Sequence, residues 1–121
     1  MARLGSTAAN QSLNALDATG SPVNQIAYVS LHTGDPSTTG ANENSGGGYA
    51  RQACTWNAAT SSAKTNSTSL TFTTAGSTAI TYFGAWTAVS SGSFGIGGAL
   101  TSSVTAVTIT VAAGALSLSS S

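Results

Sequence analysis

The residues with the greatest capacity for chemistry are His32, Asp35 and Glu43, which follow one another closely in the sequence. A histidine near two carboxylates could ligate a metal ion or exchange protons with a substrate. A turn explains the segment from His32 to Pro36 more simply, because Asp35 can accept backbone N–H hydrogen bonds and Pro36 fixes φ. We therefore interpret His32 and Asp35 as structural anchors of a turn, and we predict no metal site and no catalytic site.

Two other motifs also point away from catalysis. The glycine run at 46–48 is followed neither by a Lys-Ser pair nor by a helix signal, so it is not a phosphate-binding loop. Cys54 stands beside Trp56 in an expected strand without an activating histidine, which favours a small buried residue over a nucleophile. A single cysteine can form neither an internal disulfide nor a zinc site by itself, and we expect no cofactor.

Arg51 is the arginine in the interior of the sequence, and charged residues make up only 5% of the chain. It could form an ion pair with Asp35 or Glu43 and so fasten the segment between them to the rest of the fold. It could equally be a solvated residue on a strand. The first interpretation makes Arg51 a loop anchor, and its removal is then expected to destabilise the protein.

The aromatic residues Tyr82, Phe83 and Trp86 fall in one apolar run. In a strand, Tyr82 and Trp86 share one face and Phe83 points to the other, so at least one face must belong to the core. Core packing is the favoured interpretation, with Tyr82 and Trp86 as an alternative surface for a sugar or a protein partner. Tyr49 belongs to the same set of candidate interaction residues.

The charge balance excludes two classes of partner. Three basic residues offset three acidic ones, so the net charge is zero. Nucleic acids and anionic lipid surfaces are bound through rows of Lys and Arg that this chain lacks. No run approaches the roughly 18 consecutive apolar residues of a membrane span, and the N-terminus lacks the apolar centre of a secretory signal. With so few titratable side chains, we expect no enzyme.

The N-terminal part of the chain contains the one helix signal. Residues from Ser6 to Ala18 have a capping serine, apolar residues at roughly helical spacing, and a glycine and a proline after them. The apolar stripe, with Leu13 and Leu16, is thin, so this helix is expected to dock on the fold or on a neighbouring subunit. We predict a helical docking segment over residues 1–22.

The remainder, residues 23–121, is rich in strand and turn residues. A long glycine-rich loop is expected from His32 to Gly48 and a second polar loop from Asn57 to Asn66, since loops this long are usually functional or ordered by a partner. Strands are predicted at Ile26–Leu31, Tyr49–Trp56, Ser69–Thr73, Ala79–Trp86, Gly98–Thr101, Val104–Val111 and Ala115–Leu118. Alternation of apolar residues with threonine indicates antiparallel sheets, and we predict a mostly β protein, an antiparallel β-sandwich of jelly-roll or immunoglobulin-like type with one short N-terminal helix.

Five segments together resemble a family of small virion proteins of tailed bacteriophages, often labelled tail fibre or minor tail protein. They are Tyr28–Pro36, Gly46–Gln52, Thr81–Trp86, Gly98–Thr101 and Ala112–Leu116, and they span most of the chain. A Leu-His-Thr-x-Asp-Pro turn, a Gly-Gly-Tyr-x-Arg strand start and a late Gly-Ala-Leu are typical of that family. The turn and the strand start place His32, Asp35, Tyr49 and Arg51 at corresponding positions.

The resemblance implies a structural subunit of a virion, made in the cytoplasm of the bacterial host. A tail-associated subunit, a fibre or minor tail protein, is the first interpretation, and a capsid decoration protein on the head is the second. A receptor- or carbohydrate-binding module is the third. Its partners are expected to be other copies of itself, with a trimer favoured, and other virion proteins of the tail or capsid. An uncharged β-domain suits such symmetric assembly.

Overall fold

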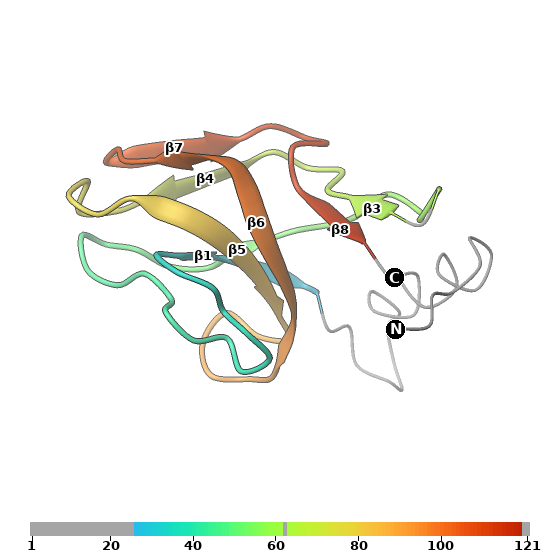
Figure 1. Ribbon diagram of the computed structural model, residues 1–121, viewed down its shortest axis with the longest axis horizontal. Helices are drawn as coiled ribbons and strands as arrows, with labels where there is room; N and C mark the ends of the chain where they lie inside the picture. Colours follow the sequence, from blue (N-terminus) through green and yellow to red (C-terminus); the bar gives the residue numbers. More distant parts are fainter. Residues whose placement is uncertain (1–25, 62, 120–121) are drawn as a thin grey trace.

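The computed structural model describes residues 26–61 and 63–119, and these form eight β-strands and no helix (Figure 1). The strands are β1 (Tyr28–His32), β2 (Gln52–Ala53), β3 (Ala63–Thr65), β4 (Leu70–Thr73), β5 (Ile80–Trp86), β6 (Phe94–Val104), β7 (Thr108–Val111) and β8 (Ser117–Ser119). Every pairing between them is antiparallel. The predicted mostly β, antiparallel architecture is therefore confirmed.

Four strands form the main sheet, in the order β2-β1-β5-β6, while β3 pairs with β8 and β4 pairs with β7. The β4–β7 pair lies over one face of the main sheet (Figure 1). Its apolar residues belong to the same buried cluster as those of β1 and β5. This cluster includes Val29, Leu31, Phe83, Ala85, Leu70, Phe72, Ile109 and Val111.

Strand alternation gives the main sheet two different faces. Val29 and Leu31 point into the apolar cluster, so Ser30 and His32 point to the opposite face. The register pairs Ser30 with Gly84, which places the small glycine next to the serine on that outer face. Within residues 26–61 and 63–119, no second sheet lies on the outer face. The loop between β1 and β2 covers it instead, as the site below describes.

Two of the predicted strands were too long. The segment Val104–Val111 was predicted as one strand, but Val104 ends β6 by pairing with Ile80, while β7 begins at Thr108 and pairs with β4. The two ends therefore belong to different sheets, and the chain must turn between them. Neither end of the segment carries a residue type that signals this change of sheet.

The predicted strand Tyr49–Trp56 is reduced to β2, with an isolated bridge from Trp56 to Asn66. The edge of β1 explains the shortening. The N–H of Asn44 donates to the carbonyl of Leu31, and the N–H of Leu31 donates to the hydroxyl of Tyr49. The backbone groups of Leu31 are therefore already hydrogen-bonded to Asn44 and Tyr49, and they are not available to pair with an extended β2.

The predicted loop Asn57–Asn66 contains the short strand β3, which pairs with β8 from the end of the chain. Lys64, in the middle of β3, is only 2% exposed. A strand of three residues whose partner lies far away in sequence has no local pattern that would reveal it.

The predicted helix Ser6–Ala18, with Leu13 and Leu16, lies outside the described residues. No helix in the described part of the chain is long and apolar enough to cross a membrane.

Candidate functional site

The candidate site is the outer face of β1 and β5 together with the loop 33–51 that covers it. Three polar side chains of this face form a directional chain of hydrogen bonds. The indole N–H of Trp86 donates to Ser30 Oγ over 2.8 Å, and Ser30 Oγ lies 2.7 Å from His32 Nε2. His32 Nδ1 lies 2.7 Å from the backbone carbonyl of Ala41, which can only accept. Nδ1 therefore carries the proton, and His32 fastens the loop to the sheet.

The Ser30–His32 contact has the atoms of a nucleophile and its base, but its surroundings make it structural. Both side chains are fully buried, and Ser30 Oγ already accepts the indole N–H of Trp86. No carboxylate orients the imidazole, whose Nδ1 donates to a backbone carbonyl. Burial lowers the pKa of His32 below its ordinary value of 6.5, against the opposing effect of the Ala41 hydrogen bond. The imidazole is thus neutral and serves as a connector.

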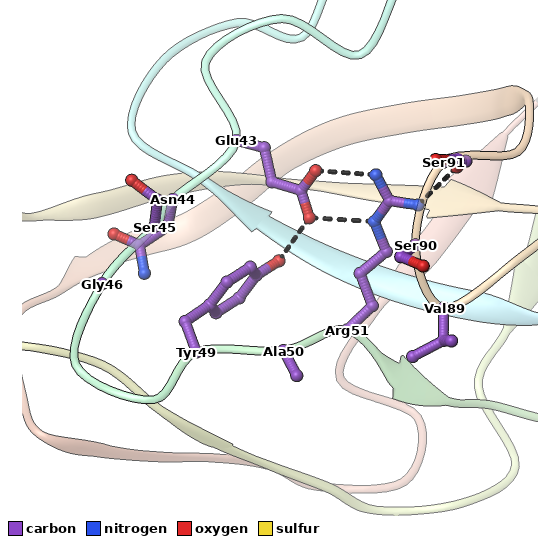
Figure 2. A pocket seen from close by; sticks show the side chains of 10 residues that line it. All are labelled: Glu43, Asn44, Ser45, Gly46, Tyr49, Ala50, Arg51, Val89, Ser90 and Ser91. Atoms are coloured by element: carbon purple, nitrogen blue, oxygen red, sulfur yellow. Dashed lines mark hydrogen bonds and ion pairs between the residues drawn. The ribbon is translucent and has the colours of Figure 1, made fainter.

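Arg51 and Glu43 form the second fastening of the loop (Figure 2). Arg51 Nη2 and Nε donate to the two oxygens of Glu43 over 2.8 and 2.9 Å, which is a bidentate ion pair. The side chains are 8% and 22% exposed, so water screens this pair little. Burial alone would raise the pKa of Glu43, but the hydrogen bonds from Arg51 and Tyr49 outweigh it and hold the pKa below 4.5. The carboxyl is therefore ionised at neutral pH.

Arg51 also reaches a third segment of the chain. Its Nη1 donates to the carbonyls of Ala88 and Ser91, in the loop between β5 and β6, over 3.0 and 2.9 Å. Its guanidinium carbon lies 3.6 Å from the ring centroid of Trp86, in cation–π contact. One side chain thus joins the loop 33–51, strand β5 and the β5–β6 loop.

Tyr49 links the loop to the core. Its hydroxyl donates to Glu43 Oε2 over 2.9 Å and accepts the N–H of Leu31 at the same distance. Its ring stacks on Phe72 of β4, with centroids 6.3 Å apart. Burial is the main cause that raises the pKa of Tyr49 well above its ordinary value of 10.0, so the phenol stays a hydrogen-bond donor.

The close approach of the loop to the sheet depends on Gly40. Its φ is +78°, a left-handed conformation that favours glycine, and a Cβ there would lie 2.4 Å from the Trp86 ring. Trp86 in turn packs edge-on against Phe94 of β6, with centroids 5.2 Å apart. The indole is therefore enclosed by the loop, by Arg51 and by β6.

A shallow depression of about 440 Å³ lies beside the ion pair (Figure 2). It is bordered by the loop residues Asn44 and Ser45 on one side and by the serines at 90 and 91 on the other. The amide nitrogen of Asn44 is buried and has no hydrogen-bond partner among the described residues. This is the one place in the described part of the chain where a buried side-chain donor is unpaired.

The structure brings together some of the residues that the sequence singled out and separates others. Arg51 pairs with Glu43 rather than Asp35. Asp35 is exposed and accepts the N–H of Ser37 over 2.8 Å, which closes the turn after β1. Trp86 is only 8% exposed, so it does not form with Tyr82 the open surface that strand alternation allowed; the loop and Arg51 cover it. Leu13 and Leu16 lie outside the described residues.

Sequence reasoning missed the roles of Ser30 and of the Glu43–Tyr49 contact. Ser30 sits between two aliphatic residues in a core strand, where a small polar residue carries no signal of its own. The sequence suggests Tyr49 as a residue of an interaction surface, but its hydroxyl points inward and donates to Glu43. The rarity of charge was the one usable signal, because it drew attention to Arg51 and the acids of the loop.

The remaining residues to consider for chemistry are the possible metal ligands of the described residues and the thiol of Cys54. Within residues 26–61 and 63–119, no three His, Cys, Asp or Glu side chains lie together as a metal site requires. Cys54 is buried in the core cluster, and burial raises the pKa of its thiol to about 11. The hydrogen bonds and the ion pair described above hold the loop 33–51 against the sheet.

Comparison with known proteins identifies the family. No curated protein matches the chain. Residues 4–119, which are nearly the whole chain, match the family model Gp80, described as "Podophage GP4 fiber I protein gp80". This agrees with the resemblance to tail-fibre proteins drawn from the His32, Asp35, Tyr49 and Arg51 motifs. The chain belongs to this family of phage fibre proteins.

Proposed function

We propose that this protein is a structural subunit of a bacteriophage tail fibre, that it works as a homo-oligomer in the virion, and that it has no enzymatic activity. The family description, which names a fiber protein, carries the proposal and favours the tail over the head. The buried Arg51–Glu43 pair supports it, because it fixes a long loop as a permanent surface with nothing reactive in it.

The remaining parts of the proposal concern architecture. Residues 1–22 are the docking segment and residues 23–121 the body, a β-sandwich in which the β4–β7 pair packs on the main sheet. The single buried cluster shared by both layers supports this arrangement. The subunit is made in the host cytoplasm. It assembles as a trimer, because phage fibres use three-fold symmetry.

The location in the virion is tested with gold-labelled antibody against the purified protein, applied to intact particles and viewed by electron microscopy. Gold at the tail is expected, and particles that lack the protein serve as the control for non-specific label. Gold on the head would mean that the protein is a capsid decoration protein and would overturn the tail assignment.

The oligomeric state is tested by sedimentation equilibrium of the purified chain. A trimer gives a mass three times the 11.8 kDa of one chain. Removal of residues 1–22 should leave the β-strand circular dichroism unchanged and should reduce incorporation into particles. Normal incorporation of the truncated protein would contradict the docking role of that segment.

A second candidate function, carbohydrate binding, is favoured by the shallow depression beside Arg51. Hydroxyl and amide groups line it, and the buried amide nitrogen of Asn44 has no acceptor among the described residues. Titration with host surface polysaccharide, followed by NMR, should perturb the Asn44 amide in this case. An unperturbed Asn44 signal at saturating polysaccharide would reject this candidate.

A further inference from the structure

An apolar groove opens between strands that belong to different sheets. It has a volume of about 390 Å³ and lies between β6 on one side and β7 with the chain entering β8 on the other. Its floor includes Leu31, Phe83 and Ile109, which are buried members of the core cluster. No charged side chain lines it. The groove thus opens onto the core, and its lining offers no charge that would recognise a charged ligand.

The strands on either side of the groove have unused edges. Among the described residues, β6 pairs only with β5, and β7 only with β4. The register between β5 and β6 shifts between Ile80 and Tyr82, so the end of β6 departs from regular pairing beside the groove. Leu100 and Val104, from this end of β6, are only partly buried. Apolar surface beside unused strand edges is available for contact with another molecule.

The distribution of charge on this protein indicates which partner occupies the groove. In the described residues, Asp35 is the one fully exposed charged residue, since Glu43 pairs with Arg51 and Lys64 is buried. Two copies of this chain can therefore approach without electrostatic repulsion. A strongly charged partner would find nothing at the groove to offset the loss of its own hydration.

A second copy also offers matching surface. Val107 and Val89 are the large apolar side chains left exposed in the described part, at 57% and 51%. Side chains of this kind lose water favourably when they enter an apolar groove. From the uncharged groove, the unused strand edges and the near absence of exposed charge, we propose that the groove between β6 and β7 is a subunit interface occupied by a second copy of this chain. This inference rests on the proposed homo-oligomeric function and names its contact surface.

The test places a charge in the groove without disturbing the core. Ser102 and Ala115 are exposed residues that line the groove, so Ser102→Lys and Ala115→Lys should fold normally. Thr108→Lys is the control, because Thr108 is also exposed, on the neighbouring strand β7, but does not line the groove. Light scattering after size-exclusion chromatography, over a range of protein concentrations, measures the dissociation constant of each variant, and circular dichroism checks its fold.

We expect the wild type and Thr108→Lys to share one oligomeric mass. The two groove variants should dissociate at concentrations about tenfold higher or more, because a lysine buried in an apolar interface loses its hydration. An oligomer unchanged in both groove variants would overturn the interface while leaving the homo-oligomer intact. A wild type that is monomeric at every concentration would overturn both.

A third outcome would identify a different occupant. If the wild type is monomeric and removal of residues 1–22 makes the groove bind an apolar fluorescent dye, the groove holds the N-terminal segment of its own chain. That result overturns the proposal. None of these outcomes changes the gold label on the tail, so the test separates the interface from the virion location.

Discussion

The two faces of β1 and β5 are built from alternate residues of the same strands and are stabilised in different ways. Leu31, on the inner face, is fully buried in an apolar cluster whose contacts have no preferred direction. His32, the next residue, points outward into hydrogen bonds with Ser30 and Ala41. The inner face should therefore accept side chains of similar volume, while the outer face should require particular atoms in particular places.

The largest effect is expected on the inner face. Leu31→Ala removes a buried side chain and leaves a cavity, which should lower the free energy of unfolding by about 2–5 kcal/mol. Leu31→Met keeps the volume and should cost less than about 1.5 kcal/mol. Chemical denaturation measures both. If Met were as damaging as Ala, the inner face would depend on shape as strictly as the outer one, and the contrast between the faces would be lost.

Arg51→Ala should have the next largest effect. It leaves the Glu43 carboxylate without its bidentate partner, and a fully buried pair broken in this way costs about 3–5 kcal/mol. Because Glu43 keeps 22% exposure, we expect about 2–3 kcal/mol.

Arg51→Lys is the sharper comparison with Leu31→Met. A lysine cannot form the bidentate pair and at the same time donate to Ala88 and Ser91, so it should recover less than half of the loss. A full rescue by lysine would mean that charge alone fastens the loop. The double variant with Glu43→Gln gives the coupling energy of the pair.

Gly40→Ala tests the close approach of the loop to Trp86. The new Cβ would meet the indole ring, and φ at this position is positive, so both a clash and backbone strain are introduced. Gly46→Ala is the matched control, because φ is +86° there and nothing lies within 4 Å of the new atom. We expect Gly40→Ala to lower stability by about 1–2 kcal/mol more than Gly46→Ala. Equal losses would show that the loop has room to move away from the sheet.

The smallest expected effect is a pH dependence that comes from the outer face. The pKa of His32 is lowered by burial, so the unfolded chain takes up a proton at a higher pH than the folded one. The stability contributed by the neutral imidazole is fully present above pH 6.5, the ordinary pKa of histidine, and is lost as the pH falls below that value.

Thermal melts from pH 7.5 to 5.0 should therefore show a declining melting temperature. His32 is the only histidine in the chain, and His32→Gln should flatten this part of the profile. The pKa of Glu43 is also lowered, so its contribution disappears only at more acidic pH, below 4.5. A His32→Gln profile as steep as that of the wild type would assign the decline to other groups.

The sequence predicts the parts of this molecule that depend on periodicity. Leu70 and Phe72 alternate with threonines, and they form β4 within one residue of the predicted bounds. The glycine-rich stretch after His32 is indeed a loop, and Cys54 is buried. These features follow from local residue type and spacing.

The missed parts depend on contacts between distant segments. Strand β3 exists because β8 pairs with it, and β2 is short because Tyr49 and Asn44 occupy the edge of β1. The choice between Asp35 and Glu43 as the partner of Arg51 depends on the path of the loop. That path is set by the close approach of Gly40 to Trp86 and by the hydrogen bond from His32 to Ala41. Neither contact can be predicted from the spacing of residues in the sequence.

The central claim is that a small polar network holds the loop 33–51 on the sheet independently of the apolar core. Amide hydrogen exchange of Arg51→Ala tests it most directly. The N–H of Asn44, bonded to the Leu31 carbonyl, should exchange at least about tenfold faster than in the wild type, while the amides of β4 and β7 keep their protection relative to global unfolding. Equal acceleration in the loop and in β4 and β7 would contradict the claim, since it would mean that the loop and the core open as one unit.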